Sequence, residues 1–144
     1  MNATTAALAI DARTLARRFG ARWILRGATF QLEAGQAAGL VGSNGSGKST
    51  LLRLLCTLLR PTAGSATVFG ADVVRDADVV RYSVGFFSPI PGVYEDLTAL
   101  ENVRFAATML HRAPAEAHAA LERVGLTHVA GERVRGFRSE EHTS

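Results

Sequence analysis

The sequence predicts an α/β protein, in which strands and helices alternate along the chain. Three neighbouring segments lead to this prediction. The apolar residues 37–41 are typical of a short buried strand, a glycine-rich segment follows at 42–50, and the leucine-rich run at 51–59 is typical of a helix. A strand, a glycine-rich loop and a helix in this order form the unit that binds phosphate groups in P-loop proteins.

The glycine-rich segment matches the pattern G-x-x-x-x-G-K-[ST] at Gly42, Gly47, Lys48 and Ser49. Glycines allow positive φ angles, so that successive backbone N–H groups form a nest for an anion. Lys48 is placed to reach the β- and γ-phosphates, and the Ser49 hydroxyl is placed to bind Mg²⁺. We therefore predict a nucleotide site made of Gly42, Ser43, Asn44, Gly45, Ser46, Gly47, Lys48, Ser49 and Thr50. The alternative is an ordinary Gly/Ser loop beside a helix.

Two strands are predicted before this motif: residues 8–15 alternate loosely between apolar and polar, and residues 23–32 are rich in apolar side chains, with Gly27 among them. After the leucine-rich helix, which Pro61 ends, we predict a strand at 66–69 closed by Gly70. A helix is predicted over 72–82 and a strand over 83–87.

The last third of the chain is predicted to be helical. The Thr98 to Glu101 spacing is a capping box, which predicts a helix from there to about residue 111. Pro114 suits the first turn of another helix, which is predicted to reach about residue 124. These two helices are expected to begin a helical subdomain.

Composition limits the class of protein. The 144 residues are 47% hydrophobic and 20% charged, as expected of one globular domain with a core of its own. The net charge of +3 is modest and the arginines are scattered, so no nucleic-acid partner is expected. Cys56 is the single cysteine, which excludes an internal disulfide. No stretch has the length of a membrane span, and a membrane role is expected to come through a partner.

From about residue 8 to 137 the chain resembles the ATP-binding subunit of ABC transporters. The resemblance is carried by residues 18–25, 42–53, 59–64, 68–70 and 94–102. It implies an antiparallel lead-in, a core strand, the P-loop with its helix, and the start of a helical subdomain. It also implies that Phe19 stacks on the adenine of ATP, although Phe19 as a core residue remains the alternative.

The resemblance further implies ATP and Mg²⁺ as cofactors. It implies a subunit that couples ATP binding and hydrolysis to transport across a membrane. Within the family, the motif sequences are most similar to those of exporter-type subunits. The implied partners are a membrane permease subunit and a second ATP-binding subunit in a dimer. The implied location is cytoplasmic, at the inner face of the cell membrane.

The sequence departs from the family pattern in two places. The loop after residues 83–87 lacks the usual glutamine, and Pro89 aligns with it, which puts Mg²⁺ coordination by this loop in doubt. The signature sequence, the Walker B strand with its Asp and Glu, and the switch histidine are also absent. We therefore expect residues 1–137 to be a partial ATP-binding domain with no catalytic residue and no appreciable ATP turnover.

The final residues, 138–144, read Arg-Ser-Glu-Glu-His-Thr-Ser. This wording resembles the translation of a common sequencing-adaptor oligonucleotide, so a non-native tail is expected. A native, solvated polar tail is the alternative.

Three other functions remain as alternatives. One is a non-transport ATPase of the same superfamily, acting for example on ribosomes or DNA. Another is an unrelated P-loop GTPase or small-molecule kinase, although the N-K-x-D motif of GTPases does not occur. The last is an inactive truncated product that at most binds nucleotide, with an unpaired sheet edge and poor solubility.

Overall fold

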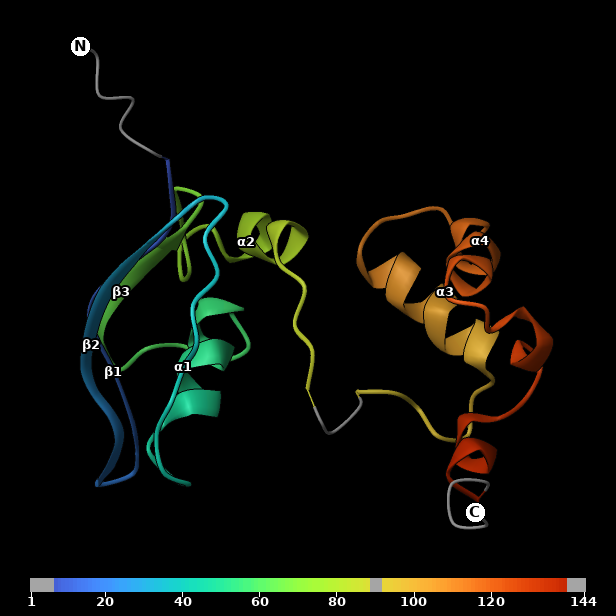
Figure 1. Cartoon of the computed structure of the whole chain (residues 1–144), viewed down its shortest axis with the longest axis horizontal. Coiled ribbons are helices and arrows are strands. Elements are labelled where there is room, and N and C mark those ends of the chain that lie inside the picture. The colour runs from blue at the N-terminus through green and yellow to red at the C-terminus, as the bar shows by residue number, and fades with distance from the viewer. Residues whose placement is uncertain (1–6, 89–91, 140–144) are drawn as a thin grey trace. The chain divides into compact units, whose positions relative to one another are not determined.

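The computed structural model of the chain describes residues 7–88 and 92–139. The chain divides into two compact units, one ending at Phe86 and the other beginning at Phe87 (Figure 1). The phosphate-loop motif lies in the first unit, and the predicted helical subdomain forms the second.

The first unit is built on a four-stranded antiparallel sheet in the order β2-β1-β3-β4. Its strands are β1 (Leu8–Phe19), β2 (Arg22–Glu33), β3 (Ala63–Val68) and β4 (Ala71–Asp72). A two-residue turn at Gly20 joins β1 to β2, and Phe69 and Gly70 join β3 to β4 with φ angles of 47° and 81°. These are the positive φ angles of a type I′ hairpin turn, whose twist matches that of the flanking strands. The strands predicted at 8–15 and 23–32 are confirmed, and both are longer than predicted.

Helix α1 (Lys48–Leu55) lies beside the sheet, and α2 (Ala77–Ser83) follows β4 (Figure 1). The core consists of buried apolar side chains from the sheet, from both helices and from the turn between β4 and α2: Ala12, Leu15, Leu51, Leu54, Leu55, Ala66, Val68, Val73 and Val80. The leucine-rich run at 51–59 is helical only as far as Leu55. Leu52 is 45% exposed whereas Leu51, Leu54 and Leu55 are buried, so α1 packs by one side only.

The strand predicted at 37–41 is not present. In Figure 1 this segment is a plain trace that runs from β2 into α1 (cyan), and the side chain of Val41 is 94% exposed. A strand requires a neighbour for its backbone hydrogen bonds, and none of the described residues pairs with this segment. The strand predicted at 83–87 fails for the same reason. Ser83 ends α2, and 84–88 have no regular structure.

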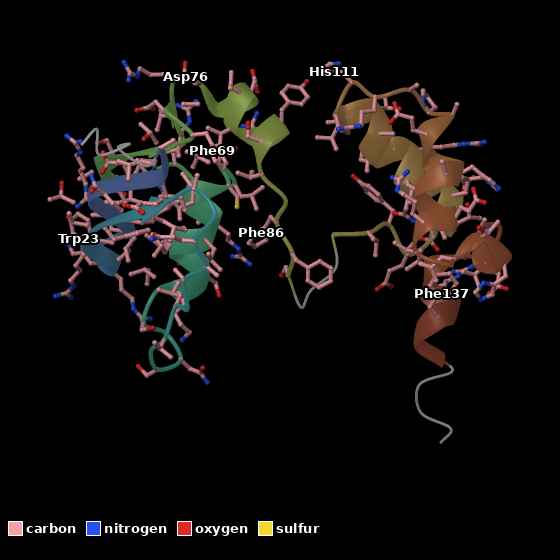
Figure 2. The ribbon with its side chains drawn as sticks, turned by 45° about the horizontal axis from the view of Figure 1, so that its top comes forward. Trp23, Phe69, Asp76, Phe86, His111 and Phe137 are labelled. Atoms are coloured by element: carbon pink, nitrogen blue, oxygen red, sulfur yellow. The ribbon has the colours of Figure 1, made fainter. Side chains whose placement is uncertain are left out.

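The second unit contains α3 (Ala99–Met109), α4 (Glu116–Arg123) and the 3₁₀ helices η1 (Thr127–Val129) and η2 (Val134–Ser139). Its small core joins Ala99, Leu121 and Ala130, and Phe137 packs against it (Figure 2). Both helices predicted for this region are confirmed. Within residues 7–88 and 92–139, no helix combines the length and the hydropathy that a membrane crossing requires.

The capping box predicted at the start of α3 is confirmed. The Glu101 backbone N–H donates to the Thr98 hydroxyl at 3.2 Å, and the Thr98 backbone N–H donates to the Glu101 carboxylate at 2.8 Å. Two N–H groups that a helix start leaves without partners are thereby satisfied.

Candidate phosphate-binding site

The glycine-rich loop reaches α1 through a short series of tight turns. The backbone N–H of Ser46 donates to the carbonyl of Ser43 at 3.2 Å, and that of Leu51 donates to the carbonyl of Gly47 at 2.8 Å. Gly45 and Gly47 have φ angles of 83° and 94°. Residues other than glycine rarely adopt such φ angles, so the glycines in the sequence determine this backbone path.

Gly47 is required for a second reason, which is space. It is the N-cap of α1, and a Cβ atom at this position would lie 2.7 Å from the backbone oxygen of Ile24 in β2. Gly42 is less confined, because the atom nearest to its Cβ position is the Ser46 hydroxyl oxygen at 2.6 Å, which can rotate away. The motif glycines therefore let the loop close on itself and let α1 begin directly against β2.

The start of α1 is electropositive. Its N-cap glycine provides no side-chain cap, and no acidic residue lies in its first turn. Helix N–H groups without partners and the positive end of the helix dipole together favour an anion at this point.

Lys48 spans the loop. Its Nζ donates to the carbonyl oxygens of Gly42 at 2.7 Å and Ser43 at 2.8 Å, and lies 3.5 Å from the Ser46 hydroxyl oxygen. These contacts hold the ammonium group over the loop, beside the N–H groups of the helix start. A phosphate bound by those N–H groups would therefore meet a positive charge as well.

A cavity of about 290 Å³ lies at this point, between the loop, the first turn of α1 and the beginning of β2. It is lined by Arg22, Ile24, Asn44, Gly45, Gly47, Lys48, Ser49 and Thr50. Both charged lining residues are cations, Asn44, Ser49 and Thr50 present an amide and two hydroxyl groups, and Ile24 adds an apolar side chain. This donor set fits a polyphosphate chain.

The same residues fit Mg²⁺ only together with phosphate. No group of three or more His, Cys, Asp or Glu side chains in the described part of the chain is arranged to hold a metal ion. Mg²⁺ in phosphate sites commonly takes few protein ligands and completes its shell with phosphate oxygens and water. Ser49, which lines the cavity, offers one hydroxyl oxygen of the required kind.

The predicted site residues fall into three groups. Asn44, Gly45, Gly47, Lys48, Ser49 and Thr50 line the cavity. Gly42, Ser43 and Ser46 instead bind the Lys48 ammonium and shape the loop. Phe19 is not a lining residue. It is 48% exposed, and the Arg17 guanidinium lies 4.5 Å from the centre of its ring.

Two lining residues, Arg22 and Ile24, were missed by sequence reasoning. Both belong to β2, and Arg22 pairs directly with Phe19 across the β1–β2 turn. In the sequence, the one feature that could have pointed to Arg22 is that it lies three residues after Phe19. Pro89, which aligns with the missing glutamine, lies outside the described residues, as do residues 140–144 of the expected tail.

Comparison with known proteins decides the family. The family described as "ABC transporter" matches residues 25–140, which is more than half of the chain. This chain belongs to the ABC transporter family. That membership removes the alternative of an unrelated P-loop GTPase or kinase, and ATP-binding domains of this family bind nucleotide.

Two curated relatives are informative. The daunorubicin resistance ATP-binding protein DrrA3 of Streptomyces coeruleorubidus is 37% identical over 125 residues, which cover 84% of this chain and 40% of that protein. The cytochrome c biogenesis ATP-binding export protein CcmA of Paraburkholderia xenovorans is 40% identical over 90 residues, covering 62% of this chain and 40% of that protein. The matched part of the chain thus spans about 40% of the length of these relatives.

A solved structure supports the fold. The ATP-binding subunit of an ABC transporter superposes with a TM-score of 0.71 at 25% identity, covering 86% of this chain and 53% of that one. The predicted fold class is therefore confirmed. The antiparallel pair β1–β2 is followed by the P-loop and α1, then by β3, β4 and α2, and then by a helical unit, as in the first part of an ABC-type ATPase domain.

Proposed function

We propose that this chain binds ATP through residues 42–50, with Mg²⁺ held between the phosphates and the Ser49 hydroxyl. The observation that carries the proposal is the cationic cavity at the start of α1, where Lys48 lies over the loop. The backbone N–H groups of the loop and the Lys48 ammonium would stabilise the negative charge of the phosphates, which binding of the nucleotide requires.

We further propose that the protein serves a membrane transporter of the exporter type, which couples ATP binding and hydrolysis to transport. The names of the two relatives support this, because one concerns drug resistance and the other export. The partners in this proposal are a membrane permease subunit and a second ATP-binding subunit. The protein would act on the cytoplasmic side of the membrane, and Phe19 would stack on the adenine.

The nucleotide proposal is tested by titrating the chain with ATP in the presence of MgCl₂ and measuring the heat of binding. We expect Lys48→Ala to weaken binding by about tenfold or more, because a hydrogen bond to a charged group contributes about 1.5–3 kcal/mol. Arg53→Ala is the matched control, since it removes a cation from the exposed face of the same helix without altering a lining residue. Equal affinities for the two variants would contradict the proposal.

A further inference from the structure

We propose that Arg22 is a second cationic binding residue for the phosphate chain, acting from β2 opposite the loop and α1. The inference rests on the proposed nucleotide binding and adds to it a residue outside the glycine-rich motif. The ligand class is a nucleoside di- or triphosphate, which is recognised here through its phosphate oxygens.

The path of β2 brings Arg22 to the loop. Arg17 pairs with Leu25 and Arg18 with Trp23, so Ile24 is one extra residue in β2 at this point. Such a bulge bends a strand and redirects its side chains, and bulges are frequent beside functional sites. The bulged residue is the one whose carbonyl oxygen lies against Gly47. The start of β2, with Arg22, is thus positioned directly against the start of α1.

Three arginines of this hairpin, Arg13, Arg17 and Arg18, have partners, whereas Arg22, which lines the cavity, and Arg26, which does not, have none among the described residues. Arg17 donates to the carbonyl of Arg60 at 2.8 Å and covers the Phe19 ring, and the Arg18 guanidinium lies 5.7 Å from the Trp23 ring centre. Within the part of the chain that the structure describes, the Arg22 guanidinium makes no hydrogen bond and no ion pair. Its donors are therefore available to a ligand in the cavity that it lines.

The chemistry of the two cations is complementary. The Lys48 ammonium is a compact point charge held at the loop, whereas a guanidinium presents a planar set of N–H donors that matches two phosphate oxygens at once. A phosphate chain between them would be neutralised from both sides. Because Arg22 lies opposite Phe19 in the hairpin, the same short turn would carry a contact for the base and a contact for the phosphates.

The test is a calorimetric titration of the full chain with ATP and, separately, with inorganic tripolyphosphate. We expect Arg22→Gln to weaken both by about three- to tenfold, as for a charge-assisted contact at an exposed site. Arg22→Lys should retain an intermediate affinity, since a lysine keeps the positive charge but lacks the planar set of N–H donors of a guanidinium. Arg26→Gln is the matched control. It lies on the same strand but lines a different hollow, with Ala16, Trp23 and Gly27, and we expect less than about a twofold change.

The outcomes separate this inference from the proposal on which it rests. If Arg22→Gln binds each ligand as tightly as Arg26→Gln does, while Lys48→Ala binds more weakly, the role of Arg22 is refuted and the nucleotide site stands. If Arg22→Gln loses affinity for ATP but not for tripolyphosphate, the contact is to the base or ribose and the inference is wrong. If the wild-type chain binds neither ligand, both proposals fail. Circular dichroism of each variant verifies that the sheet is intact.

Discussion

Gly47 connects the sequence motif to the geometry of the site. It combines a φ angle of 94° with a position where even a methyl group would press on the Ile24 carbonyl of β2. Gly45 has a similar φ angle of 83° but has nothing within 4 Å of where its Cβ would be. The two glycines therefore separate the effect of backbone conformation from the effect of space.

This difference gives a prediction for two matched variants. Gly45→Ala carries only the cost of a left-handed conformation, about 1–2 kcal/mol. Gly47→Ala carries the same cost and in addition displaces α1 from β2, so we expect a larger loss of stability and a larger loss of ATP affinity. Urea unfolding and ATP titration measure the two effects. Equal losses in both variants would show that the close approach to Ile24 does not matter.

Residue types alone predicted the glycine-rich loop, because its pattern fixes chemistry and backbone conformation together. They did not predict Arg22. An arginine in a strand has no pattern of its own, and its place at the cavity depends on the bulge at Ile24, which only the three-dimensional pairing of β1 and β2 reveals.

At the level of elements, the helical unit begins with the capping box of α3. Its Thr98 hydroxyl accepts the backbone N–H of Glu101. We predict that Thr98→Ala destabilises the helical unit by about 1 kcal/mol, the usual loss for a missing N-cap, while Thr98→Ser is close to neutral. Urea unfolding followed by the helical circular dichroism signal checks this. A Thr98→Ala variant as stable as the wild type would contradict it.

The capping box of α3 also predicts that the stability of the fold depends on pH. The hydrogen bond from the Thr98 backbone, followed by that from its side chain, lowers the pKa of Glu101 below its ordinary value. A carboxyl group with a lowered folded-state pKa stabilises the fold above its unfolded-state pKa, and this contribution is lost as the pH falls through the lowered value. We therefore expect the stability difference between wild type and Glu101→Gln to be greatest above about pH 5 and to vanish in strong acid. Unfolding curves across this range measure it, and a constant difference would refute the role of the carboxylate.

The elements that the sequence predicted correctly are those that carry their own signals. The helix after Thr98 has a capping box, the helix after Pro114 buries Ala117 and Leu121 one turn apart, and the strands of the first hairpin pair with each other. Residues 37–41 and 83–87 have strand-like composition, but a strand also needs a partner. Among the described residues none offers them one, so their apolar side chains do not enter a sheet.

For the molecule as a whole, the chain matches the ABC transporter family over residues 25–140 and contains the phosphate-loop pattern within that range. No apolar strand ending in Asp-Glu follows Gly125. We therefore predict that the purified chain releases phosphate from ATP no faster than its Lys48→Ala variant does, even where it binds ATP. A phosphate-release assay under saturating ATP checks this prediction. Steady release that depends on Lys48 would contradict it.

The first unit also leaves apolar side chains in water. Leu40 and Phe86 are about four-tenths exposed, and Val41 is almost fully exposed. Because exposed apolar surface favours association, we predict that the isolated chain self-associates as its concentration rises. Sedimentation velocity over a range of concentrations measures this directly. A monomer throughout that range would contradict the prediction.

The central claim is that the backbone N–H groups of residues 42–50 bind phosphate, and amide chemical shifts test it most directly. The chain is labelled with ¹⁵N and titrated with ATP and MgCl₂, and each amide resonance is followed. The account predicts that the largest shifts fall on Asn44, Gly45, Gly47, Lys48 and Ser49, and that Lys48→Ala weakens the response. Shifts confined to other parts of the chain, with these amides unmoved, would contradict it.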